Sequence, residues 1–342
     1  MKKRVTTALI VMMVAGWLAG CGGEQKSAPA ATPAPAGPAG LKIAMIAKSA
    51  TNPVFVSARK GADAAAKELS QKHSIPIEIV WMTPSDEDGQ VQAQKIAQAV
   101  KDGVSAILIS CSDAGKVTGA IDDAVAHGVP VMTFDSDAAG SKRFAFYGVD
   151  DGKTGEMLMR ELAAQIRKKG SVAILAGNEN APNLQKRVDG AKKEAAKTPG
   201  IKIVGTFHHI ETPKDAAAEV VRVQKANPQI QGWAMVGGWP LFTPRLLSDL
   251  DPAKVKVVAI DALPAELVYV DKGLAPVLLA QPTYMWGYVS VQRIFDKVQL
   301  KQDVPEIIPM EVVKVTKDSL GTWARQLKTW GFTVPEMYVK MP

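Results

Sequence analysis

The chain has 342 residues, of which 47% are hydrophobic and 22% are charged, and its formal net charge is +7. This length is enough for two ordinary domains with a sizeable core. The basic excess includes Lys2, Lys3 and Arg4 and is otherwise spread over mixed helical faces, without a basic stripe interleaved with aromatic residues. The composition therefore argues against a nucleic-acid-binding surface.

Residues 1–20 have the pattern of a secretory signal peptide. The basic start, MKKR, precedes the apolar run VTTALIVMMVAGWLAG, which is too short and wrongly flanked for a stable membrane span. The run ends in Leu18-Ala19-Gly20-Cys21, which resembles the lipobox of bacterial lipoproteins. That resemblance implies lipidation at Cys21 and a lipid anchor in a bacterial membrane. An apolar helix that merely ends in cysteine is the alternative, and the order of the three regions argues against it.

Residues 21–40 follow as a segment dominated by Pro, Ala and Gly, with the sequence CGGEQKSAPAATPAPAGPAG. Such a composition cannot bury a core and is typical of a flexible, extended tether. We expect this tether to hold a soluble domain away from a membrane, with the protein in the periplasm or at the cell surface.

From residue 41 onward, short apolar runs alternate with longer amphipathic ones. In the first half the strand-like runs lie at 41–47, 75–81, 104–110, 129–134 and 144–149. The segments between them have helical spacing, as in VQAQKIAQAVKDG. This alternation predicts a parallel sheet with helices on both faces.

A second series of the same kind follows. Its strand-like runs lie at 171–177, 201–207, 230–236, 255–260 and 275–281. Its helical patterns lie near 151–169, 183–197, 213–226, 241–249 and 284–299. The chain is therefore predicted to be an α/β protein with two doubly wound, Rossmann-like domains. In such folds ligands bind outside the carboxyl ends of the strands.

Motifs of the common enzyme classes do not follow any of these strands. We find no G-x-S-x-G, P-loop or G-x-G-x-x-G sequence there, which argues against hydrolase, NTPase and dehydrogenase readings. Cys111 ends an apolar run and is expected to be a buried hydrophobe. His208 and His209 lack partners at metal-ligand spacing, and PSDEDGQ at 84–90 lacks the spacing of a calcium loop. We therefore expect no metal and no cofactor.

Polar and aromatic side chains recur at the strand ends and in the helices that follow them. These residues are Asn52, Phe55, Asp135, Asp150, Asp151, Arg187, Asp261 and Gln281. Carboxylates and amides accept or donate hydrogen bonds to hydroxyl groups, a guanidinium donates to them, and an aromatic ring covers the C–H face of a sugar. This set of groups suits a polyhydroxylated ligand.

In the order and spacing of several motifs, the chain resembles the ribose/galactose-type (type 1) periplasmic binding proteins of bacterial ABC sugar importers. The resemblance covers residues 41–315, and its motifs are NPVFVSARKGADAAAKE, GVPVMTFDSD, YGVDDGKTGEML, RVDGAKKEA, VVAIDALP and AQPTYMWGYVSV. It implies two domains joined by a three-strand hinge. The implied N-terminal domain comprises 41–149 plus 282–312, and the implied C-terminal domain comprises 150–281 plus 313–342.

The resemblance also implies the function. It predicts a non-enzymatic, monomeric solute-binding lipoprotein that captures a small polar ligand, a monosaccharide, between its domains and delivers it to an ABC permease. The ligand-binding residues that it implies are Asn52, Phe55, Asp135, Arg187, Asp261 and Gln281. We add Trp239, which stands in a Gly-rich loop at a strand end and is a candidate aromatic platform.

Each of these assignments has a structural alternative. Asn52 is also suited to cap the following helix, and Phe55 to fill the core of its first turn. Tyr284 and Trp286 are candidates for packing the start of a helix. Asp135, Arg187 and Asp261 have a structural ion-pair network as their alternative, although positions at separate strand ends favour a shared cleft.

Two departures from the family pattern bear on the ligand. Val54 stands where the family often has an aromatic residue, and Gly237-Gly238-Trp239 replaces a frequent Asn-Asp pair. Ribose therefore does not follow from the resemblance. The alternatives are a nucleoside, a polyol or a furanosyl signal that the same fold binds for sensing. A lipid-anchored α/β enzyme acting through Cys111 or Asp135 is a further alternative.

Overall fold

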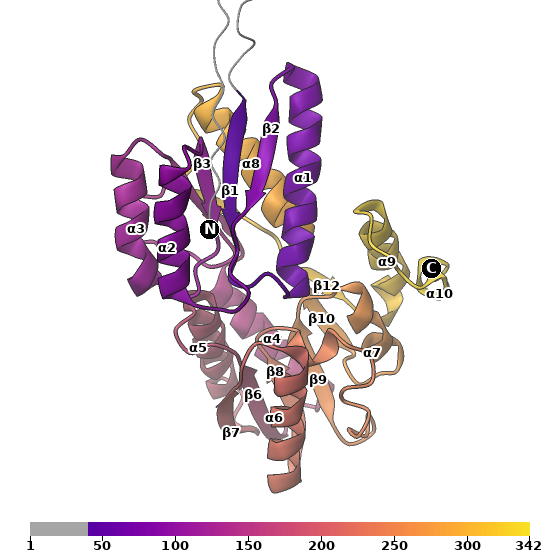
Figure 1. Cartoon of the computed structure of the whole chain (residues 1–342). Coiled ribbons are helices and arrows are strands. Elements are labelled where there is room, and N and C mark those ends of the chain that lie inside the picture. Colours follow the sequence, from indigo (N-terminus) through magenta and orange to yellow (C-terminus); the bar gives the residue numbers. More distant parts are fainter. Residues whose placement is uncertain (1–39) are drawn as a thin grey trace, which may run out of the picture. The chain divides into compact units, whose positions relative to one another are not determined.

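A computed structural model describes residues 40–342 of the chain (Figure 1). The predicted signal peptide, the lipidation of Cys21 and all of the tether except Gly40 lie outside these described residues. Among the helices between residues 40 and 342, none is both long and apolar enough to cross a bilayer.

The secondary structure alternates strands and helices along the chain. In the first half the elements are β1 (Leu41–Ile46), α1 (Pro53–His73), β2 (Ile77–Trp81), α2 (Gly89–Lys101), β3 (Ala106–Ile109), α3 (Ala114–Ala126), β4 (Val131–Phe134), β5 (Ala145–Gly148) and α4 (Asp151–Gln165). In the second half they are β6 (Gly170–Ala176), α5 (Pro182–Ala196), β7 (Ile201–His208), α6 (Pro213–Ala226), β8 (Ile230–Met235), η1 (Trp239–Leu241), β9 (Lys256–Ile260), η2 (Pro264–Glu266), α7 (Leu267–Asp271), β10 (Val277–Ala280), α8 (Thr283–Val298), β11 (Ile307–Pro309), β12 (Val313–Val315), η3 (Lys317–Ser319), α9 (Leu320–Thr329) and α10 (Glu336–Val339).

The first sheet has the strand order β11-β5-β4-β3-β1-β2, and all of its pairings are parallel. Successive residues of β1 face opposite sides, as a strand requires. Ile43 and Met45 join the core under α1 and α8, whereas Ala44 and Ile46 join the core under α2 and α3. Figure 1 shows these helix pairs on opposite sides of the sheet. Both faces of the sheet are therefore buried.

The second sheet has the order β12-β10-β9-β8-β6-β7 and is parallel except for β12, which runs antiparallel to β10. Helix α4 contacts β8 and β9, and α5 contacts β6 and β7. The predicted fold class, two α/β domains with mostly parallel sheets, is confirmed.

The chain passes between the two sheets three times. β5 belongs to the first sheet and β6 to the second, β10 belongs to the second while α8 packs against α1, and β11 and β12 belong to different sheets. The crossings thus fall between β5 and α4, between β10 and α8, and between β11 and β12. The exact domain boundaries, at 149/150, 281/282 and 312/313, stay a prediction.

One predicted helix is wrong. Residues 241–249 form the end of η1 and a series of turns, with no α-helix. Pro244 lacks a backbone N–H and disfavours a helical conformation in the residue before it. Arg245 then adopts a left-handed backbone with φ 74°, which no α-helix accommodates.

The C-terminal segment after β12 contacts both halves of the molecule. The indole of Trp323 donates to the carbonyl oxygen of Ala262 at 2.7 Å, beside the end of β9. The ring of Trp330 stacks on Tyr284 of α8, with centroids 5.4 Å apart. Tyr284, in the first turn of α8, therefore packs against the C-terminal segment.

Candidate functional site

The seven predicted site residues are all buried. Their exposed fractions are Asn52 6%, Phe55 2%, Asp135 4%, Arg187 2%, Trp239 4%, Asp261 5% and Gln281 3%. Asp135 directly follows β4, Asp261 follows β9 and Gln281 follows β10, so these three stand at carboxyl ends of strands. Loops at this edge are where open α/β sheets bind ligands.

Asp135 and Asp261 share an unusual backbone conformation. Their φ angles are 58° and 82°, in the left-handed region. Such a conformation costs a non-glycine residue free energy, and Asp is among the few residue types that adopt it. Each turn aims a carboxylate off the end of its strand, one from each sheet, and strained residues of this kind cluster at functional sites.

Arg187 is the centre of the polar network on the C-terminal side. Its Nε donates to Asp151 Oδ1 at 2.7 Å, its Nη1 to the carbonyl oxygen of Val236 at 3.0 Å, and its Nη2 to Gln281 Oε1 at 2.9 Å. Gln281 in turn donates through Nε2 to Asp261 Oδ1 at 3.0 Å. The guanidinium is thus held by a side chain of α4 and by residues that directly follow β8 and β10, so its orientation does not depend on a ligand.

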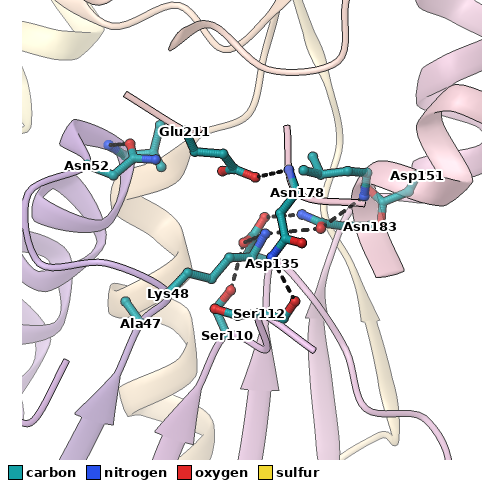
Figure 2. Close-up of polar contacts among 12 residues, drawn as sticks. Ala47, Lys48, Asn52, Ser110, Ser112, Asp135, Asp151, Asn178, Asn183 and Glu211 are labelled. Atoms are coloured by element: carbon teal, nitrogen blue, oxygen red, sulfur yellow. Dashed lines mark hydrogen bonds and ion pairs between the residues drawn. The ribbon is translucent and has the colours of Figure 1, made fainter. Parts of the chain in front are cut away.

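A second network lies on the N-terminal side (Figure 2). Ser110, at the end of β3, donates through Oγ to Asp135 Oδ2 at 2.7 Å. Lys48, just after β1, lies with its Nζ 3.9 Å from the same oxygen. Asn183 of α5 joins the pair: its Nδ2 donates to Asp135 Oδ1 at 3.1 Å, and its Oδ1 accepts from Lys48 Nζ at 3.1 Å. Asn183 therefore links helix α5 of the second domain to residues that follow β1 and β4 of the first sheet.

The two networks meet at Arg187, whose Nη2 lies 3.9 Å from Asp135 Oδ1. The structure therefore brings together four predicted residues, namely Asp135, Arg187, Asp261 and Gln281. These residues also contact one another: Arg187 lies close to Asp135 directly and reaches Asp261 through Gln281. An ion-pair network and a ligand site are thus not exclusive alternatives here.

Asn52 and Phe55 are placed differently. Asn52 caps α1, and its Oδ1 accepts from the backbone N–H of Val54 at 3.2 Å. Phe55 packs among aromatic rings, with centroids 6.4 Å from Phe134 and 6.3 Å from Trp286. Both residues therefore have the structural roles that stood as alternatives, and their contact with a ligand stays a prediction.

Trp239 lies in η1, where its Nε1 donates to Glu211 Oε2 at 3.1 Å and its ring meets His209 edge-on. The preceding glycines have a packing reason. A side chain at Gly237 would collide with the ring of Trp239, and one at Gly238 with the carboxyl group of Glu266. Gly237 and Gly238 thus leave room for the indole of Trp239 and for the carboxyl group of Glu266.

Sequence reasoning missed Lys48, Ser110 and Asn183 of the networks, and it noted Asp151 without assigning it to the site. For three of these four residues the sequence contains a signal. Lys48 is a charged residue at the end of an apolar strand run, where a solvent-exposed lysine would not be expected. Asp151 was noted beside Asp150, but only Asp150 is exposed and caps α4. Asn183 precedes Arg187 by four residues and therefore shares its helix face.

Burial perturbs the titration of this site. Desolvation raises the pKa of Asp151 and of Asp261 to about 6, and the nearby Arg187 offsets only part of that effect. For Lys48, burial works to lower the pKa, but Asp135, Glu87 and Glu211 outweigh it and raise the pKa above its ordinary value. The site thus holds a charged lysine and two carboxyl groups, Asp151 and Asp261, whose pKa values lie close to neutral pH.

Two other kinds of functional group bear on the chemistry of residues 40–342: a nucleophilic thiol and a cluster of metal ligands. Cys111 is fully buried, and desolvation raises the pKa of its thiol. A buried thiol of high pKa is a poor nucleophile. Between residues 40 and 342, no cluster of three or more His, Cys, Asp or Glu side chains has the geometry of a metal site.

Comparison with known proteins decides the family. A family model described as a periplasmic binding protein domain matches residues 43–302. The chain belongs to this family. Among its curated relatives, the ribose import binding protein of Bacillus subtilis is 30% identical over 148 residues, which are 43% of this chain and 46% of the relative.

Two further relatives of this periplasmic binding protein are informative. The D-apiose import binding protein of Actinobacillus succinogenes is 26% identical over 56% of this chain and 59% of its own length. The aligned regions thus span about half of the length of the curated relatives. A crystal structure of an ABC transporter solute-binding protein from Burkholderia graminis, in complex with D-arabinose, has a TM-score of 0.75 and 27% identity. That match covers 82% of this chain and 96% of the other.

Proposed function

We propose that the chain is an extracytoplasmic solute receptor that binds a monosaccharide between its two domains and delivers it to an ABC importer. The observation that carries this proposal is the convergence of Asp135, Arg187, Asp261 and Gln281 at carboxyl strand ends of two opposed sheets. Carboxylates, an amide and a guanidinium are the groups that recognise sugar hydroxyls. The proposal assigns no enzymatic activity.

Hinge closure gives the receptor its mechanism. Asn52, Phe55 and Asp135 would approach a ligand from the first sheet, and Arg187, Trp239 and Asp261 from the second, with Gln281 at a hinge. A ligand that bridges both groups binds the closed arrangement more tightly than the open one and therefore shifts the equilibrium towards closure. A closed receptor is the form that we propose the permease recognises.

The sugars that the relatives are named for, or hold, suggest which ligands to test first. Two of the proteins compared above are named for ribose and apiose, and the third holds D-arabinose, so all three ligands are five-carbon sugars. Another relative, 29% identical, is named for D-ribose and for D-allose, which has six carbons. We therefore propose pentoses as the first class to test and hexoses as the second. Val54 and the indole of Trp239 distinguish this site from the family pattern, so its stereochemical preference is not transferred from any one relative.

A thermal-shift screen tests the proposal. The panel contains D-ribose, D-arabinose, D-apiose, xylitol, D-glucose, D-galactose and adenosine, because a ligand that binds only the folded state raises Tm. We expect at least one monosaccharide to raise Tm, and Asp261→Asn to weaken that shift. Asp249→Asn, an exposed acid on a loop of the same domain, is the matched control and keeps the shift. Stabilisation by adenosine alone, or by no compound, would contradict a sugar receptor.

The anchor is a separate proposal. Lipidation at Cys21 would fix the receptor to a membrane while the following Pro-rich residues keep the binding domains free to meet a permease. We expect the full chain to partition into the membrane fraction and Cys21→Ser to appear in the soluble extracytoplasmic fraction. Equal partitioning of the two chains would exclude a lipid anchor at this position.

A further inference from the structure

Two carboxyl groups from opposite sheets meet at one wall of the cleft. Glu87 lies in the loop between β2 and α2, and Glu211 lies in the loop between β7 and α6. Both line a cavity of about 700 Å³ whose walls come from the loops of both sheets. Both carboxyl oxygens of Glu87 are buried and receive no hydrogen bond from any described residue. Its immediate side-chain neighbours are Glu211 and Asn178.

The two carboxyl groups have unequal surroundings. Glu211 Oε1 accepts from the backbone N–H of Asn178 at 2.9 Å, and its Oε2 accepts from Trp239 Nε1 at 3.1 Å. These two donors fix the position of the Glu211 carboxyl group. The Asn178 side chain lies beside Glu87 and works to lower its pKa, but no donor meets either Glu87 oxygen in hydrogen-bond geometry, and an ionised carboxylate can only accept. A proton on Glu87 would make its carboxyl group a donor, so that Glu87 could form a hydrogen bond to Glu211.

We propose that Glu87 and Glu211 form an inter-domain proton-binding site, in which one shared proton stabilises the closed arrangement of the two domains. The inference rests on the hinge closure proposed above, but it requires no particular sugar. It makes closure a proton-linked event, so that the receptor closes more readily in an acidic medium.

Other charged groups face this pair from several elements. They are Lys48 after β1, Asp86 and Asp88 on the loop of Glu87, Asp113 and Lys116 at the start of α3, Glu179 after β6, and His208 and His209 at the end of β7. Burial lowers the pKa of His209 and so disfavours its charged form. Lys48 opposes protonation of Glu87, but burial and Glu211 outweigh it and raise the pKa of Glu87 well above its ordinary value.

The sign of the linkage follows from this direction. When the domains separate, Glu87 returns to water and to an ordinary pKa of about 4.3. The closed form therefore binds more protons than the open form between that value and its own raised pKa. Within this window the ratio of closed to open molecules falls by up to about tenfold for each unit of rising pH.

Distance measurement between two spin labels tests the inference without a ligand. Gln94 of α2 and Ala218 of α6 are exposed, and each is replaced by cysteine for labelling in a full chain that also carries Cys21→Ser, while buried Cys111 is left in place. In this background we expect the shorter-distance population to shrink as the pH rises from 5 to 8. Glu87→Gln should keep that population at every pH, because its amide donates to Glu211 without a proton.

Asp86→Asn is the matched control, since Asp86 is exposed on the same loop and the substitution removes the same charge. It should retain the pH response of the labelled parent. The inference is overturned if the parent shows no pH response, if Glu87→Gln responds as the parent does, or if Asp86→Asn abolishes the response equally. Any of these results leaves the sugar screen unaffected, and a failed sugar screen leaves the distance measurement valid.

Discussion

Both domains contain a closely packed helix pair, but the side chains buried beside the two pairs differ: aromatic rings in one domain and an ion pair in the other. In the N-terminal domain, α1 and α8 approach through Gly61 and Gly287, and in the C-terminal domain α4 and α5 approach through Gly155 and Gly190. A Cβ at any of these four positions would overlap a backbone carbonyl oxygen of the facing helix. Both helix pairs therefore need glycine at these positions to approach so closely.

The difference lies beside the glycines. The α1 and α8 pair encloses the stacked rings of Phe55 and Trp286, whereas the α4 and α5 pair encloses the ion pair of Asp151 and Arg187. Burying the apolar surface of these rings is nondirectional and stabilises their own domain. A buried ion pair depends on geometry and holds a guanidinium towards the cleft. The same architecture thus provides stability on one side and a positioned binding group on the other.

Arg187→Ala should have the largest effect, because it breaks the C-terminal ion pair and leaves Asp151 buried without its cation. We expect the free energy of unfolding to fall by about 3–5 kcal/mol, measured by urea unfolding, and ligand-dependent stabilisation to be lost. Lys186→Ala removes an exposed charge one residue earlier and serves as the control. A change of less than about 1 kcal/mol would mean that Arg187 is not a structural element of its domain.

Gly155→Ala and Gly61→Ala compare the two helix pairs directly. Each should lower the free energy of unfolding by about 1–3 kcal/mol through overpacking. Only Gly155→Ala should also weaken ligand binding, because its new Cβ meets the backbone of Arg187. Gly119→Ala, in α3 with open space around it, should instead stabilise by about 0.5–1 kcal/mol. Equal losses of affinity in the first two variants would erase the contrast between the domains.

A pH series tests the ionic character of the C-terminal side. Asp151 and Asp261 have pKa values of about 6 in the folded state, above their values in the unfolded chain. Their contribution to stability is therefore present at low pH and is lost as the pH rises from about 4 to about 6. Asp261→Asn should reduce this loss by up to about 3 kcal/mol. The prediction fails if urea unfolding of both chains has the same pH dependence.

Asn183→Ala should lower the free energy of unfolding by only about 1 kcal/mol, because it removes hydrogen bonds to Lys48 and Asp135, which follow strands of the first sheet. It should instead shift the label-to-label distance distribution towards open molecules. The exposed Asn180→Ala, in the turn just before α5, is the control. An unchanged distribution would show that Asn183 does not contribute to closure.

Much of the fold could be predicted from the sequence because its signals are local. Alternating apolar and amphipathic runs specify strands and helices wherever they occur, and polar residues directly after a strand specify the binding edge of a parallel sheet. Asp135, Asp261 and Gln281 were found in this way. The error at 241–249 arose where a helical pattern contains Pro244, whose backbone effect overrides side-chain periodicity.

By itself, the sequence determined the α/β class, the order of elements and the positions at which polar side chains leave the strands. Only the tertiary structure decided their partners. That Arg187 binds Asp151, that Asn183 reaches Lys48 and Asp135, and that Phe55 turns into an aromatic core depend on helices brought together by glycines far apart in the chain. Pairing of this kind is set by non-local packing, which local periodicity does not encode.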